Sequence, residues 1–133
     1  MSEDPCPCGS GKSVSNCCGP ALDRRAVPET AEGLMRSRYS AYVRQDIAYL
    51  KETLWPKFQG RFDEAGTAAW AAENHWAGLS VLATDKGGVG DRDGTVLFEA
   101  KFLSGGKLQT HRELSRFRKK AGRWFYVEAV PER

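Results

Sequence analysis

The stretch from Gly94 to Val130, GTVLFEAKFLSGGKLQTHRELSRFRKKAGRWFYVEAV, decides the fold of this 133-residue chain. It contains three runs rich in β-branched and aromatic residues, separated by glycine-containing turn signals. The runs cover residues 94–104, 107–118 and 122–130, and the turns are Ser104-Gly-Gly106 and Lys120-Ala-Gly122. Because strands joined by such short turns pair as hairpins, the sequence predicts an antiparallel sheet.

Upstream of this stretch a fourth β-rich run covers residues 79–85, and before it the hydrophobic period changes from two to between three and four. Three helices are predicted there. Thr30 caps one that runs to about Arg44, Asp46 caps a short one, and Asp63 opens one that ends at Gly78. The chain is therefore predicted to be an α+β domain, with helices packed on one face of a curved four-stranded antiparallel sheet.

All four cysteines lie in one short segment, Cys6-Pro-Cys8-Gly-Ser-Gly-Lys-Ser-Val-Ser-Asn-Cys17-Cys18. Four thiolates can fill the tetrahedral shell that Zn²⁺ favours, and the Gly-Ser-Gly turn lets the second cysteine pair reach the first. The predicted metal ligands are Cys6, Cys8, Cys17 and Cys18. Because sulfur would fill all four positions around the ion, we expect a structural zinc that leaves no position for water or substrate.

Disulfides or a redox-active dithiol are the alternative to a zinc site. The neighbouring Cys17 and Cys18 cannot comfortably bridge each other. We recognise no N-terminal secretory signal, and clustered cysteines in a cytosolic chain usually bind metal, so zinc is favoured. No apolar run approaches the length that crosses a bilayer. A cytoplasmic protein without membrane partners is expected.

The length of the chain allows one sizeable core, and the cysteine segment is too short to build a second. Proline-containing dipeptides bracket that segment. We expect a zinc knuckle over residues 1–22 and an α+β domain over residues 23–133.

The formal net charge is +3, and the basic excess lies toward the C-terminus. The basic cluster comprises Arg116, Arg118, Lys119, Lys120 and Arg123. Such a cluster can meet phosphates or an acidic protein. The favoured interpretation is simpler, because exposed hairpin turns normally carry solvated charges.

Several of these segments resemble known families. The cysteine segment resembles the SEC-C zinc motif, with Val14, Ser15 and Asn16 in place of the aromatic and lysine residues usual there. Three further stretches resemble the YchJ-like bacterial family: Thr30-Ala-Glu-Gly-Leu-Met-Arg-Ser-Arg-Tyr-Ser-Ala-Tyr-Val43, His111-Arg-Glu-Leu-Ser-Arg-Phe117 and Trp124-Phe-Tyr126.

The resemblance implies a nuclear-transport-factor-2-like (NTF2-like) domain of the cystatin-like kind, a cone of helices wrapped over a curved sheet and often hollow. It implies no particular activity, because this fold hosts isomerases, dehydratases, hydrolases and binding proteins alike. The SEC-C resemblance implies protein or ribonucleoprotein partners.

A candidate pocket follows from Arg38, which stands among apolar residues of the first helical pattern. A buried arginine needs a partner, and Glu99 and Glu113 are the candidates. His111 and Glu113 share one face of a strand, but both faces are mixed, so the inward face stays open. If the His111 face lines the cone, the candidate pocket is walled by Arg38, Tyr39, Trp76, Glu99, His111 and Glu113, with Trp124 as a further wall.

Such a set could polarise or deprotonate a small carbonyl or anionic ligand. The interpretation that the sequence favours is structural, with an internal ion pair between Arg38 and Glu113. His75 is expected to be a surface or capping residue near a helix end.

Two functions remain. The first is an adaptor that uses the knuckle as a rigid recognition surface for a protein or ribonucleoprotein. The second is a small-molecule-binding protein or enzyme with a polar pocket in the cone. The sequence favours the adaptor over an enzyme because the cysteine motif is the more specific signal. The pocket hypothesis requires an open cavity and an inward Arg38.

Overall fold

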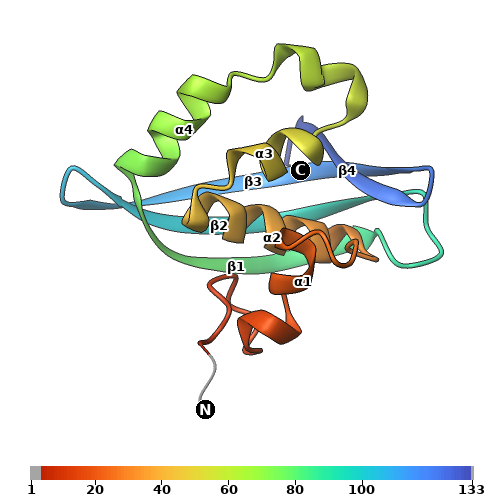
Figure 1. Ribbon diagram of the computed structural model, residues 1–133, viewed down its shortest axis with the longest axis horizontal. Coiled ribbons are helices and arrows are strands. Elements are labelled where there is room, and N and C mark those ends of the chain that lie inside the picture. Colours follow the sequence, from red (N-terminus) through yellow and green to blue (C-terminus); the bar gives the residue numbers. More distant parts are fainter. Residues whose placement is uncertain (1–3, 133) are drawn as a thin grey trace.

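The computed structural model describes residues 4–132. One antiparallel sheet, with strand order β1-β2-β3-β4, carries the helices α2 and α3 on one face, and α4 arches above it (Figure 1). The strands are β1 (His75–Lys86), β2 (Asp93–Ser104), β3 (Lys107–Lys120) and β4 (Arg123–Val130). The helices are α1 (Gly19–Leu22), α2 (Ala31–Arg44), α3 (Ile47–Glu52) and α4 (Glu64–Glu73), with 3-10 turns η1 (Val14–Asn16) and η2 (Pro56–Arg61). The predicted α+β fold is confirmed.

Side-chain caps start the three longer helices at the predicted residues. Thr30 Oγ1 accepts a hydrogen bond from the third amide of α2 at 3.0 Å. Asp46 and Asp63 accept equivalent bonds at the starts of α3 and α4, at 3.1 and 2.9 Å. Each cap satisfies a backbone N–H that has no partner inside the helix. Between α2 and α3, Gln45 takes a left-handed conformation with φ 58°, which makes the predicted bend.

The predicted end of the third helix at Gly78 is wrong. Helix α4 stops at Glu73, and the Asn74 side chain donates to the Trp70 carbonyl oxygen at 2.8 Å. Strand β1 then begins at His75, four residues earlier than predicted. Pairing with the end of β2 supplies long-range hydrogen bonds that a local helical pattern cannot reveal. His75 is therefore an exposed strand residue rather than a helix cap.

The core lies between α2, α3 and the inner face of the sheet. Leu34, Leu50, Val96 and Phe117 are fully buried there. Because Phe117 points inward and strand residues alternate, His111 and Glu113 also lie on the inner face. The sequence left open which face of β3 is inward, and the structure shows that it is the face of His111 and Glu113.

The knuckle docks on this body beneath β1 (Figure 1). Cys6, Cys8 and Cys18 are buried in the same apolar cluster as the core of the larger domain. A side chain at Gly9 would come within 2.9 Å of the Leu79 carbonyl oxygen of β1. The division at residues 22 and 23 stays a prediction.

None of the helices in the described part of the chain combines the length and hydrophobicity needed to cross a bilayer.

Candidate functional site

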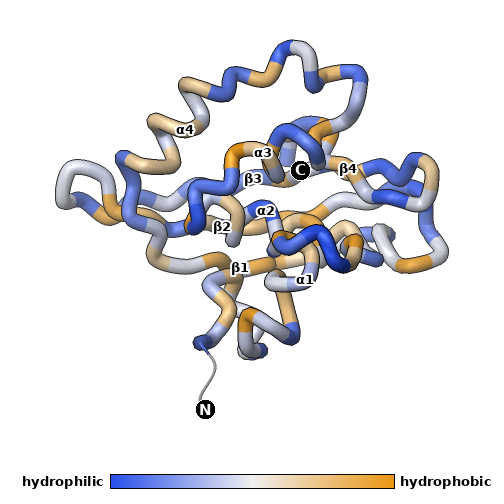
Figure 2. The backbone as a smooth tube through the Cα atoms, in the orientation of Figure 1, coloured by the Kyte–Doolittle hydropathy of each residue, from blue (hydrophilic) through white to orange (hydrophobic). Residues whose placement is uncertain are grey.

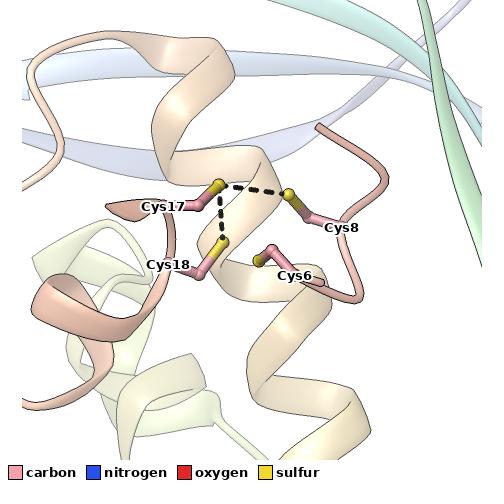
Figure 3. Close-up of side chains that lie close together, drawn as sticks. All are labelled: Cys6, Cys8, Cys17 and Cys18. Carbon is pink, nitrogen blue, oxygen red and sulfur yellow. Dashed lines mark hydrogen bonds between the residues drawn. The ribbon is translucent and has the colours of Figure 1, made fainter. Parts of the chain in front are cut away.

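The four cysteines converge on one point (Figure 3). All four Sγ atoms lie within 4.8 Å of one another, and the residues are free cysteines. The Sγ of Cys17 lies 3.5 Å from that of Cys8 and 3.9 Å from that of Cys18. Zinc–sulfur bonds of about 2.3 Å in a tetrahedron place neighbouring sulfurs about 3.8 Å apart. These separations fit a metal ion and exceed by far the roughly 2.05 Å of a disulfide bond.

The local backbone folds so that the two cysteine pairs meet. The Cys6 amide donates to the Lys12 carbonyl oxygen at 2.8 Å, which closes the turn that carries Cys8. The following 3-10 turn η1 then brings back Cys17 and Cys18, which directly precede helix α1. Each cysteine is therefore placed by local structure, which is why the spacing alone predicted that the four thiols converge.

Helix α2 supplies the surroundings of the cysteine cluster. Arg36 Nη1 donates to the Cys8 carbonyl oxygen at 2.8 Å and lies 3.9 Å from its Sγ. Ser40 Oγ lies 3.7 Å from the Cys6 Sγ, and from the knuckle itself Ser10 Oγ lies 3.1 Å from the Cys17 Sγ. Such donors orient metal-bound thiolates and offset their negative charge.

The thiols of Cys8, Cys17 and Cys18 differ in pKa. Hydrogen bonds from the other groups of the cluster, above all Cys18, lower the pKa of Cys8 to about 4 against the effect of burial. Its hydrogen bond with Cys8, together with burial, raises the pKa of Cys18. Burial also raises the pKa of Cys17. The Cys8 thiolate thus forms easily, whereas deprotonation of Cys17 and Cys18 is opposed. A divalent cation bound among the sulfurs would favour deprotonation of all of them.

A second site lies between α2, α4 and the inner face of the sheet. It is a cavity of about 130 Å³. Its walls combine aromatic and polar side chains: Met35, Arg38, Tyr39, Tyr42, Trp70, Trp76, Phe98, Ala100, His111, Glu113, Ser115 and Tyr126. Five of the six candidate pocket residues lie in these walls: Arg38, Tyr39, Trp76, His111 and Glu113.

Arg38 is buried, with 7% of its surface exposed. Its Nη1 donates to the Leu50 carbonyl oxygen at 2.9 Å and to Thr53 Oγ1 at 2.7 Å, and its guanidinium lies 4.7 Å from the centre of the Tyr126 ring. Burial lowers the pKa of Arg38, against the opposing effect of nearby groups that include Glu113. Within the described residues no ion pair joins Arg38 and Glu113, so the predicted direct pair is replaced by contacts to α3 and its end.

Glu113 is held by three donors instead. His111 Nε2 lies 3.0 Å from its Oε1, and the hydroxyls of Tyr126 and Ser115 donate to its Oε2, that of Tyr126 at 2.8 Å. Burial and the neighbouring Glu113 raise the pKa of Tyr126, which keeps the phenol protonated as a donor. The carboxylate is therefore a fixed part of the cavity wall.

Two residues that were predicted to wall the pocket, Glu99 and Trp124, lie elsewhere. Glu99 faces the opposite side of the sheet, where its carboxylate pairs with Arg112 at 3.0 Å. It sits one residue from the inward Phe98 and Ala100, so strand alternation turns it outward. Trp124 does not line the cavity either, and its Nε1 donates to the Glu29 carbonyl oxygen at 3.0 Å.

Sequence reasoning missed several residues of the cavity. Tyr42 lies one helical turn from Arg38, and Ser115 lies two residues from Glu113 on the same strand face, so the helical and strand periods could have found both. Trp70 lies on α4 and Tyr126 on β4, and no periodic pattern in the sequence links them to the other cavity residues. Only the packing of α4 and β4 brings them to the site.

The predicted basic cluster lies at the β3–β4 turn, where hydrophilic residues gather at the right edge of Figure 2. Arg118 and Lys120 lie over the ring of Trp55, at 4.9 and 5.8 Å from its centre. Lys119 donates to the Val89 carbonyl oxygen at 2.7 Å. These contacts fit a turn that serves the structure, and binding of phosphates there stays a prediction.

Comparison with known proteins agrees with this architecture. Residues 30–129 match the family model described as "YchJ, middle NTF2-like domain". A UPF0225 protein of Geobacter sulfurreducens is 45% identical over 123 residues, which cover 92% of this chain and 76% of the relative. A UPF0225 protein of Actinobacillus succinogenes is 39% identical over 127 residues, covering 96% and 82%.

Two solved structures are similar over 96% or more of this chain, and both are described as SEC-C motif containing proteins. The solution structure from Rhodopseudomonas palustris has a TM-score of 0.88 at 41% identity and covers 96% of this chain and 98% of that one. The crystal structure from Psychrobacter arcticus has a TM-score of 0.81 at 30% identity, covering 100% and 85%.

Proposed function

The chain belongs to the YchJ-like UPF0225 family, and from that premise we propose that it is a zinc-containing protein that binds a small molecule in the cavity between α2 and the sheet. The observation that carries the proposal is the cavity itself, with a buried Arg38 in its wall. Concave sites with mostly apolar walls and a few converging polar groups are the usual form of ligand sites. The sequence alone favoured the adaptor, but with the cavity taken into account we favour the small-molecule-binding protein.

Zinc is the metal that the donor set favours. Four sulfur ligands within 4.8 Å of one another suit the tetrahedral shell of Zn²⁺, and a closed shell would make it a structural ion. Metal analysis of protein purified in reducing buffer should find about one zinc per chain, and Cys8→Ser should lose most of it. Wild-type protein that holds no metal, or holds it equally well after Cys8→Ser, would contradict this part of the proposal.

Ligand binding is tested by filling the cavity. Ala100 is buried in β2 and lines the cavity, whereas Ala83 is exposed on β1 away from it. Single-ring probes such as benzyl alcohol and benzamide should shift the NMR signals of the Trp70 and Trp76 indole N–H groups. Ala100→Leu should abolish the shifts, and the matched Ala83→Leu should leave them intact. If no probe shifts either signal at about 10 mM, where even weak ligands of this size bind, the proposal is wrong.

The adaptor is a second candidate, favoured by a cleft of about 750 Å³ between the knuckle and the start of α2. Lys12, exposed on the knuckle turn, and Arg36 of α2 both line it. A protein or ribonucleoprotein that reads this cleft should be retained by intact protein and lost with Lys12→Glu, which keeps all four thiols. Identical sets of retained partners for wild type, Lys12→Glu and Cys8→Ser would refute the adaptor.

A further inference from the structure

The cavity offers hydrogen-bond donors that nothing in the described chain satisfies. Of the three guanidinium nitrogens of Arg38, only Nη1 has partners there, which leaves Nε and Nη2 without any. The indole Nε1 of Trp76, whose ring lines the same cavity, is buried with no hydrogen-bond partner. Both oxygens of Glu113 already accept hydrogen bonds. Nε and Nη2 of Arg38 are not among the fully buried atoms without a partner, so they stay open to the solvent of the cavity, where a ligand can reach them. Because buried donors are normally satisfied, the acceptor missing at Trp76 Nε1 is expected from a ligand.

The charges of the cavity point the same way. Arg38 is buried, yet among residues 4–132 no carboxylate lies within ion-pair distance of it. Glu113, the predicted partner that lines the same cavity, is bound by His111, Ser115 and Tyr126. A buried cation without a contacting anion is unfavourable, and an anionic ligand would remove that cost.

The free edge of Arg38 also has a specific shape. Since Nη1 is tied to the Leu50 carbonyl oxygen and to Thr53, the remaining edge is formed by Nε and Nη2. The N–H bonds of those two nitrogens are parallel, and their spacing matches that of the two oxygens of a carboxylate. The free groups therefore fit a planar, two-oxygen anion.

Beside this edge stands an aromatic wall. The ring centres of Trp70 and Trp76 are 5.1 Å apart, and that of Tyr42 lies 5.6 Å and 5.4 Å from them. The cavity volume of about 130 Å³ is close to the roughly 150 Å³ of a protein cavity that binds benzene. The ligand should thus carry one ring or a short branched chain.

We propose that the cavity binds a small monocarboxylate, whose two oxygens accept hydrogen bonds from Nε and Nη2 of Arg38 and whose apolar part lies against Tyr42, Trp70 and Trp76. This inference rests on the proposed function, since it names the class of molecule that the same cavity binds.

The test compares two probes of the same shape on the full, zinc-loaded chain. Benzoate carries the carboxylate and benzamide is its neutral counterpart. In calorimetric or NMR titrations, benzoate should bind with a dissociation constant of about 0.1–1 mM and about ten- to hundredfold more tightly than benzamide. Arg38→Met should remove this preference. Arg112→Met, the same substitution on the opposite face of β3, should retain it.

Arg38→Lys guards against loss of folding in the methionine variant, because it keeps the charge and removes the two-pronged edge. It should reduce the preference for benzoate. Equal binding of benzoate and benzamide to the wild type would overturn the carboxylate inference and leave the cavity as a small-molecule site. Absence of binding by both probes would overturn the inference and the proposed function together.

Discussion

Replacing Gly9 with alanine separates the docking of the knuckle on the sheet from the folding of its turn. Gly9 and Gly11 belong to the same turn and both have left-handed backbones, with φ 79° and 87°. An added Cβ at Gly9 would lie 2.9 Å from the Leu79 carbonyl oxygen, whereas at Gly11 it would meet nothing within 4 Å. Gly11→Ala is therefore a matched control for local strain.

The two variants should differ by the contact with β1. A left-handed alanine costs about 1–2 kcal/mol, and this cost is common to both. At Gly9 the clash adds about 1–3 kcal/mol, as is typical of overpacking. With about 4 °C per kcal/mol for a chain of this size, the melting temperature of Gly9→Ala should lie about 4–12 °C below that of Gly11→Ala.

Urea unfolding of the zinc-loaded variants, followed by tryptophan fluorescence, measures the difference directly. All four tryptophans lie outside the cysteine segment, at Trp55 or beyond, so their signal follows the unfolding of the body and records how much the lost contact with β1 destabilises it. Equal unfolding free energies for the two variants would show that the turn does not rest on the sheet. After chelation of the metal, the body should remain folded and melt at a lower temperature.

Other substitutions test the caps, the charges and the cavity wall. Thr30→Ala should lower the unfolding free energy by about 1 kcal/mol in urea titrations, because the first turn of α2 loses its cap, and Thr30→Ser should restore it. Burial raises the pKa of Asp46, but hydrogen bonds from Arg24 and a backbone amide lower it by more, so the folded pKa lies below the ordinary value. Its contribution to stability is then present above about pH 4 and lost as the pH falls through the folded pKa, and Asp46→Asn should flatten the acid side of the stability profile. Tyr126→Phe removes one donor to Glu113 and should cost about 1–3 kcal/mol in urea unfolding; an unchanged value would mean that the bond contributes nothing.

Much of the fold could be predicted because its signals are local. Thr30, Asp46 and Asp63 cap helices through bonds that span three residues, and glycine turns separate the strands of the two C-terminal hairpins. The end of α4 escaped prediction because β1 gains its first residues by pairing with β2, about 25 residues away in the sequence.

The sequence by itself determined the cysteine cluster, since its four cysteines lie within one short segment whose turns can bring them together. Tertiary structure alone decided which face of β3 is inward, that Glu99 faces away and that Arg38 is held by α3 rather than by Glu113. The physical reason is that a strand with two mixed faces has no intrinsic inside. Its orientation depends on how much apolar surface the helices, β2 and β4 bury against each face together, and only the packed chain fixes that sum.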